Sequence, residues 1–286
     1  SDLSLRFERD TRHTDLSLTW AAERVDFAWG GHIRQAELTC AMQGSKDFLA
    51  FQEIAFTSSV FNMAGTAQLL RFKDKGDAVL DLELHSKEFA YDEVVACLPT
   101  KYFPAWLGDL LVRQIRGGRS QFKVIRYRGR LHELTRWDTC LKNLQVEQAL
   151  NGQSFSISNA KRVTGVTGLA VASRGTIEIK GLSAQMGDSR IRAVTLKFPD
   201  IVTRGFRIVV TVDLDMRAAD FISAWRASIP PPEVRQILDP VHTVQSGRVR
   251  GAVQVYYENG APTSIIKGWS ALKGCTLAWD KVSIRN

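Results

Sequence analysis

The sequence lacks the local signatures that commonly mark an enzyme active site. It has no H-E-x-x-H, G-x-S-x-G, P-loop or G-x-G-x-x-G pattern. Its histidines are solitary: His13, His32, His85, His132 and His242. We therefore expect no catalytic residues, no metal ligands and no cofactor, and nothing in the sequence favours an enzyme.

Cysteine is scarce, and the four cysteines have no C-x-x-C spacing. Cys97 lies in a segment with helical character, whereas Cys40, Cys140 and Cys275 lie in or beside strand-like segments. Solitary cysteines are most often small buried hydrophobic residues. We expect all four to be free thiols.

The sequence also lacks an initiating methionine, a signal core and any run of 18 apolar residues. We therefore expect the chain to be an excised part of a longer protein. A hydrophobic content of 44% predicts a folded protein. The net charge of +8 favours anionic partners such as phospholipid headgroups or nucleic acid.

Short segments with a period of two dominate the chain. In FRIVVTVDL, Phe206, Ile208, Val210, Val212 and Leu214 alternate with other residues, and AVLDLEL repeats the pattern with Ala78, Leu80, Leu82 and Leu84. Turn signals such as DKGD and ENG separate these segments. The pattern predicts a mainly antiparallel β protein.

Two interruptions of this pattern resemble each other. The segments 89–112 and 217–241 each predict a short helix, a proline break and a second helix, with hairpins at about 91–112 and 219–241. Val234 follows Leu107 by 127 positions, and Gly247 follows Gly118 by 129. We interpret this as an internal repeat of strand, helical hairpin, glycine and strand.

The segment GGRSQFKVIRYRGR, residues 117–130, is basic and carries no acidic residue. The repeat aligns it with GRVRGAVQVYYEN, which keeps the alternation and loses most of the charge. A strand that binds single-stranded nucleic acid would need a continuous basic groove with exposed aromatic residues. We therefore expect no specific nucleic-acid partner.

The segments KEFAYDEVVACLPTKYFPAWL and DMRAADFISAWRASIPPPEVRQILD, each followed by a glycine-opened strand, carry a family resemblance. Together with GLSAQMGDSRIRAVTLKF, they resemble the AsmA-like family of bacterial envelope proteins, a TamB- and YhdP-like group related to bridge-like lipid-transfer proteins. The similarity extends from about residue 30 onward. It rests on patterns and not on an invariant catalytic residue.

The resemblance implies a long twisted antiparallel sheet curled into an apolar groove, with two short helical hairpins. The first repeat would occupy residues 1–130 and the second residues 131–286. The implied function is to shelter lipid acyl chains and to conduct phospholipid between the inner and outer membranes. The implied location is the periplasm, with an inner-membrane anchor outside this sequence, although free cysteines are unusual in an oxidising compartment.

The predicted lipid-binding residues are apolar residues of alternating segments: Leu80, Leu82, Leu84, Phe206, Ile208, Val210, Val212, Leu214, Val253 and Val255. Arg126 and Arg128 are the predicted headgroup contacts. The same alternation also fits a closed sandwich core. The alternative function is therefore a structural or scaffolding envelope protein that binds partner proteins.

Overall fold

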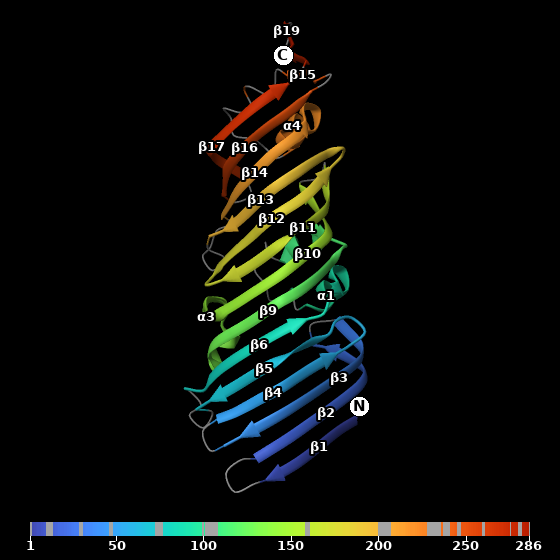
Figure 1. Ribbon diagram of the computed structural model, residues 1–286, viewed down its shortest axis with the longest axis vertical. Coiled ribbons are helices and arrows are strands. Elements are labelled where there is room, and N and C mark those ends of the chain that lie inside the picture. The colour runs from blue at the N-terminus through green and yellow to red at the C-terminus, as the bar shows by residue number, and fades with distance from the viewer. Residues whose placement is uncertain are drawn as a thin grey trace. The chain divides into compact units, whose positions relative to one another are not determined.

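The computed structural model describes residues 2–9, 14–28, 31–45, 48–71, 77–98, 100, 108–157, 161–199, 207–227, 236, 241–244, 247–258, 261–274, 276–279 and 282–285. These residues form one antiparallel sheet of 16 strands, a second sheet of three strands, and a few short helices (Figure 1). The predicted mainly antiparallel β fold is confirmed.

The large sheet follows chain order almost without exception. Its main path is β1-β2-β3-β4-β5-β6-β9-β10-β11-β12-β13-β14-β16-β17, and the short strands β7 and β8 pair with β9 and β10. The first nine strands are β1 Asp2–Arg9, β2 Thr14–Phe27, β3 Gly31–Gly44, β4 Phe48–Thr57, β5 Met63–Leu70, β6 Val79–Ser86, β7 Phe89–Ala90, β8 Ile115–Arg116 and β9 Arg119–Arg130.

The remaining strands of the large sheet are β10 Leu144–Ile157, β11 Lys161–Ser173, β12 Thr176–Met186, β13 Ser189–Phe198, β14 Arg207–Arg217, β16 Arg248–Glu258 and β17 Ala261–Lys273. The small sheet contains β15 Val241–Val244, β18 Thr276–Trp279 and β19 Val282–Arg285. Neighbouring strands are joined mostly by short turns, which is the connection that antiparallel pairing allows.

The helices are α1 Tyr91–Cys97, the π-helix η2 Leu110–Gln114, the 3-10 helix η3 Leu131–Thr135, α3 Trp137–Asn143 and α4 Ala218–Ala227. Acidic residues lie in the first turns of α1, α3 and α4, where they interact favourably with the helix dipole. Two of these elements, η3 and α3, were not predicted. Cys140 lies in α3, which ends directly before β10, so it lies beside a strand and not in one.

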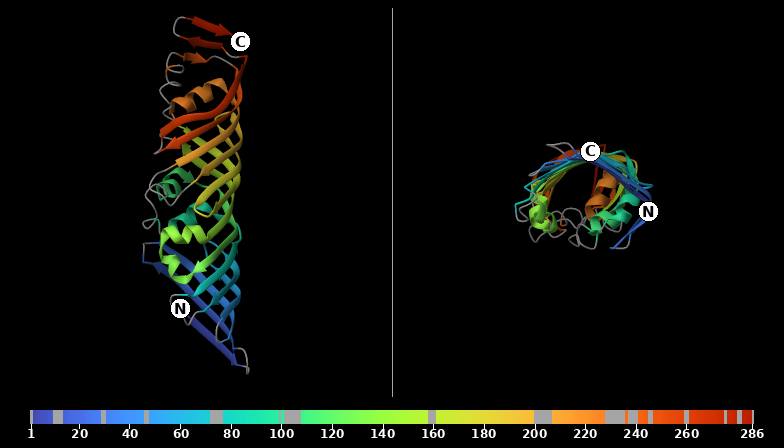
Figure 2. Two further views of the ribbon diagram at one scale, coloured as in Figure 1. Left: turned by 90° about the vertical axis from the view of Figure 1, so that its left-hand side faces the viewer. Right: turned by 90° about the horizontal axis from the view of Figure 1, so that it is seen from below.

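The chain divides into two compact units. Unit 1 contains residues 1–112, 119–149 and 171–175, and unit 2 contains 113–118, 150–170 and 176–286. In each unit, taken by itself, the helices lie on one side of the sheet (Figure 2). The predicted repeat boundary between residues 130 and 131 stays a prediction.

The predicted helical hairpins begin where expected, between two strands that pair with each other. In unit 1, α1 follows β7, which pairs with β9; in unit 2, α4 follows β14, which pairs with β16. Residues 101–107 lie outside the described residues, and so do 228–240 apart from residue 236. The first hairpin ends as a π-helix, and residue 241, the predicted end of the second, begins strand β15.

Glycines precede the strand that returns from each hairpin. Gly118 has a φ of 72° and Gly247 a φ of 101°, a backbone region that other residues rarely adopt. The Gly247 carbonyl accepts a hydrogen bond of 3.1 Å from the N–H of Ala218, the first residue of α4. The glycine therefore fixes the start of the helix beside the start of β16.

Gly65 allows a close approach between β5 and β6, and this gives a stability prediction. A Cβ atom at Gly65 would overlap the backbone carbonyl of Glu83, which cannot move without separating the strands. We expect Gly65→Ala to lower the free energy of unfolding by about 2 to 4 kcal/mol, measured by urea denaturation.

The matched control is Gly44→Ala in β3. A Cβ atom there would first meet the flexible Leu49 side chain, at 3.2 Å from its Cδ1. We expect this variant to lose less than about 1 kcal/mol. Equal urea midpoints for the two variants would contradict the strand spacing described above.

Candidate lipid-binding face

Two adjacent cross-strand rows of unit 1 contain only apolar residues and one glycine. Each row crosses six strands, β2, β3, β4, β5, β6 and β9, through successive paired residues. The first row is Leu16, Met42, Phe51, Ala67, Leu82 and Tyr127, and the second is Leu18, Cys40, Ile54, Gly65, Leu84 and Ile125. We call these two rows the apolar rows.

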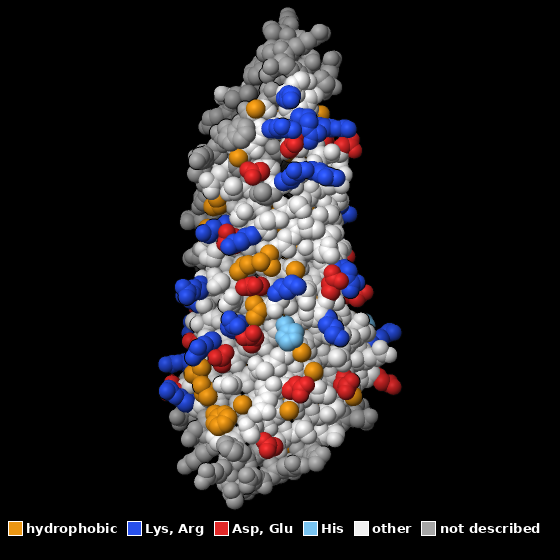
Figure 3. All heavy atoms as spheres, in the orientation of Figure 1, with side chains coloured by type: hydrophobic (Ala, Val, Ile, Leu, Met, Phe, Trp, Pro, Cys, Tyr) orange, Lys and Arg blue, Asp and Glu red, His pale blue; other side chains and the backbone are white. Residues whose placement is uncertain are grey.

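The opposite face of the same strands is polar. On this face, a row of paired residues crosses the same six strands, and each of them is next in sequence to a residue of the first apolar row. These residues are Asp15, Gln43, Ala50, Gln68, Asp81 and Arg128. Successive residues of a strand point to opposite faces, so the alternation sorts the residue types by face. Figure 3 shows the face that lies away from the helices, where Lys, Arg, Asp and Glu side chains are widespread.

Most residues of the apolar rows are only half-buried. Cys40, Ala67 and Tyr127 are buried, whereas the other nine residues of the two rows keep intermediate exposure. A residue inside a closed sandwich core would be covered by a second sheet packed about 10 Å away. Within unit 1, the described residues contain no second sheet that could cover the rows in this way. The three-stranded sheet belongs to unit 2.

The helix α3 covers one end of the first apolar row. Tyr127, 1% exposed, donates a hydrogen bond of 2.9 Å from its hydroxyl to the Arg130 carbonyl. Glu133 in η3 accepts hydrogen bonds from the Arg130 N–H at 2.9 Å and from Asn143 Nδ2 at 2.8 Å. Burial, followed by the charge of Glu133, raises the pKa of Tyr127. These bonds hold η3 and α3 at the end of β9.

Unit 2 has its own apolar cluster on the helix side of the sheet. Its buried members come from β11, β12, β13 and β14: Val163, Val166, Leu182, Met186, Val194 and Met216. Phe221 and Ala224 of α4 pack against this cluster. The helix therefore covers apolar residues here, as α3 does in unit 1.

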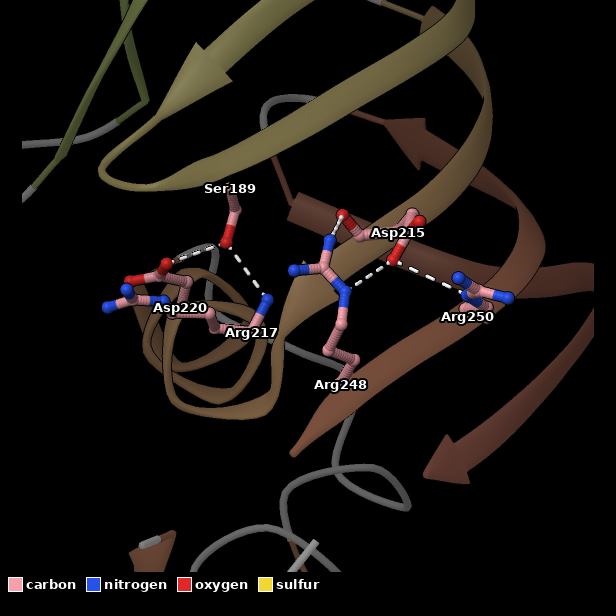
Figure 4. Close-up of polar contacts among 6 residues, drawn as sticks. All are labelled: Ser189, Asp215, Arg217, Asp220, Arg248 and Arg250. Carbon is pink, nitrogen blue, oxygen red and sulfur yellow. Dashed lines mark hydrogen bonds and ion pairs between the residues drawn. The ribbon is translucent and has the colours of Figure 1, made fainter. Parts of the chain in front are cut away.

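A buried serine attaches α4 to the sheet. The hydroxyl of Ser189, 0% exposed, donates to Asp220 Oδ2 at 2.6 Å and accepts the backbone N–H of Arg217 at 2.9 Å (Figure 4). Ser189 opens β13 and Asp220 lies in the first turn of α4. This contact ties the helix to a turn 31 residues earlier in the chain.

The predicted lipid-binding residues are placed as follows. Leu80, Leu82 and Leu84 are half-buried in β6, paired with Gly129, Tyr127 and Ile125 on the apolar face. Val210 is half-buried and packs against the apolar cluster of unit 2. The structure places the backbone of the next five predicted residues in two strands: Ile208, Val212 and Leu214 in β14, and Val253 and Val255 in β16. The side chains of these five residues lie outside the described part, and so does the whole of Phe206.

Arg126 and Arg128 lie on the polar face of the sheet, whereas Leu82 and Leu84 lie on its apolar face. Arg126 pairs with Glu83, with its Nη2 at 2.6 Å from Oε2, and Arg128 lies 3.6 Å from Asp81. Hydrogen bonding and charge from Glu83 raise the pKa of Arg126. Their headgroup role stays a prediction that this placement does not favour, because a headgroup would have to displace the two carboxylates.

The apolar residues of β2, β3 and β4 were not among the predicted site residues. The segment TDLSLTW, which supplies Leu16 and Leu18, carries the same alternation as β6, and this was a sufficient signal to find them. Phe51 and Ile54 of β4 are three residues apart and reach the same face because the register shifts between them, which alternation does not predict. What the sequence could not supply was the register that aligns them into rows.

Three of the four cysteines lie in the described part of the chain. Cys40 and Cys140 are free thiols, the Cys97 Sγ lies 3.6 Å from the His32 carbonyl oxygen, and Cys275 lies outside the described residues. Burial raises the pKa of all three thiols, with a contribution from Glu93 at Cys97, and so disfavours the nucleophilic thiolate. The described residues contain no group of three or more His, Cys, Asp or Glu side chains arranged for a metal ion.

Comparisons with known proteins give no relative: no family model, no curated protein and no solved structure matches the chain. Within the part of the chain that the structure describes, every helix is too short or too polar to cross a membrane.

The Tyr127 hydroxyl gives a second stability prediction. Tyr127→Phe keeps the buried ring and removes the donor to the Arg130 carbonyl. We expect a loss of about 1 kcal/mol in the free energy of unfolding. The control Thr66→Val, at an exposed position of β5, should change stability by less than about 0.5 kcal/mol. A Tyr127→Phe variant as stable as the parent would show that the bond is not formed in solution.

Proposed function

We propose that the chain binds lipid acyl chains along the apolar face of its sheet, as a segment of a cell-envelope protein that conducts phospholipid between membranes. The observation that carries this proposal is the pair of apolar rows, which contain no polar side chain except the buried Tyr127 hydroxyl and the Cys40 thiol, yet remain mostly half-exposed. Binding of this kind requires no catalytic residue.

The dimensions of the rows suit an acyl chain. Strands of a sheet are about 4.8 Å apart, so six strands give a row about 24 Å long. One leaflet of a bilayer has a hydrocarbon depth of about 15 Å. A row is therefore long enough for an extended acyl chain to lie across the strands. Each methylene that leaves water contributes about 0.8 kcal/mol to binding.

The resemblance to AsmA-like proteins supports the finer parts of the proposal. These are a sheet curled into a groove with the apolar face inside, a periplasmic location and an inner-membrane anchor outside this sequence. Phospholipid is then the expected ligand, and further envelope proteins are expected partners. The alternative, a scaffolding protein with a closed β core, would need another layer over the apolar rows.

Site-specific photocross-linking tests the proposal. A photoreactive phenylalanine analogue at Leu84, on the apolar face, is compared with the same analogue at His85, the next residue of β6, which is exposed on the polar face. We expect cross-links to phospholipid from position 84, detected by mass spectrometry after expression in a bacterial envelope, and at least tenfold fewer from position 85.

Two results would contradict the proposal. Cross-links from position 84 to protein alone would support the closed core or the scaffolding function. Equal lipid cross-linking at both positions would mean that lipid contacts the sheet without regard to face.

A further inference from the structure

Strand β9 has helical segments at both of its ends. Helix α1 lies in the segment that precedes β9, and η3 and α3 follow β9 directly. Among the described residues, no helix separates β1, β2, β3, β4, β5 and β6 from one another. In unit 1 the helices lie on the side of the sheet that carries the apolar rows (Figure 2). The apolar face at β9 is therefore open to cover from both ends of the strand.

At the C-terminal end of β9, α3 lies directly on the apolar face. A Cβ atom at Gly129 would lie 2.6 Å from Nδ2 of Asn143, a residue of α3, and 2.7 Å from the Tyr127 hydroxyl oxygen. The position therefore has no room for a side chain. Tyr127 itself is 1% exposed. Neither of these two positions of β9 is open to a ligand.

At the N-terminal end of β9, the segment that leads into α1 fills the same face. Phe89 of β7 pairs with Ser120 of β9, and these residues are 3% and 1% exposed. Because the helices of unit 1 lie on one side of the sheet, such low exposure places both residues on that side. Residues 87 and 88, between β6 and β7, interrupt the alternation and allow this change of face. The Phe122 ring packs against Phe89, with 5.2 Å between the ring centroids.

Between these two covers, Ile125 remains half-exposed. On the neighbouring strand β6, Leu80, Leu82 and Leu84 are all half-exposed. Residues of one face of a strand are about 7 Å apart, so the open width falls from about 20 Å at β6 to about 7 Å at β9. Packed hydrocarbon atoms are about 4 Å apart, so two chains side by side need about 8 Å and one chain about half of that. We call the open position at Ile125 the gap.

We propose that acyl chains cross β9 one at a time at the gap, and that the size of the Ile125 side chain determines which lipids cross. The inference rests on the proposed function and adds a specificity-determining residue to it. A sheet that needed only a packed core would gain from covering Ile125 as well, because apolar surface in water is unfavourable. The class of lipid that the gap favours has unbranched acyl chains.

Cysteine labelling tests the gap without reference to lipid. Ile125→Cys is compared with Leu84→Cys, at its cross-strand partner in β6, and peptide mass spectrometry separates each new thiol from the four native cysteines. The probes are methyl methanethiosulfonate, which is small, and a fluorescein maleimide, which is bulky. We expect the rate of the bulky probe relative to the small one to be at least tenfold lower at position 125. Equal rate ratios at the two positions would overturn the inference.

Photocross-linking tests the crossing itself. A photoreactive phenylalanine analogue replaces Ile54 in β4 or Val146 in β10, which lie on opposite sides of β9 in the sheet. Val146 lies on the apolar face, because the next residue, Glu147, acts on Arg126 of the polar face and contributes to its raised pKa. We expect Ile125→Trp to lower phospholipid cross-links at one of the two positions at least fivefold and to leave the other within twofold of the parent.

The matched control is His85→Trp, which places the same side chain at an exposed position on the polar face of β6. We expect it to leave both positions within twofold of the parent, with thermal unfolding measured for every variant. Cross-links that Ile125→Trp leaves unchanged at both positions would overturn the inference, and so would loss at both, which would mean that the whole face is disturbed. A parent without lipid cross-links would overturn the proposed function, whereas the labelling rates would still report on the gap.

Discussion

The structure depends on the separation of residue types by the two-residue period of an extended strand. A single sheet has two faces, and here the period places apolar residues on one face and charged residues on the other. A sheet with one apolar face has to cover it, because apolar area exposed to water costs about 25 cal/mol per Å². Helices α3 and α4 cover parts of that face, and nine residues of the apolar rows stay half-exposed. The open remainder is what gives the fold a lipid-binding function in our account.

The polar face differs between the units in the way its charges are balanced. In unit 1 the cross-strand partner of Arg126 is Glu83 and that of Arg128 is Asp81, so the charges cancel within the sheet. In unit 2 the cross-strand partner of Arg217 is Arg248, and the acidic partners of these two residues are Asp188 and Asp215.

Much of the fold was predictable because it is encoded in local alternation. The strands β6 and β14 follow from the two-residue period, and the starts of α1 and α4 follow from the two interruptions of that period. The helices η3 and α3 were missed because the bonds that fix them join Glu133 to Arg130 and Asn143, a side-chain arrangement with no usual capping residue. The pairing of Arg126 with Glu83 joins residues 43 positions apart and depends on register, which local alternation does not specify.

The central claim is that the apolar face is open to lipid and is not the core of a closed β structure. Its most direct test is the amount of phospholipid that accompanies the chain when it is purified from bacterial membranes without detergent, extracted into organic solvent and quantified by mass spectrometry. We predict about one phospholipid or more for each chain, as expected for acyl chains that lie along the apolar rows. Phospholipid at the level of an unrelated protein purified in the same way would contradict the account.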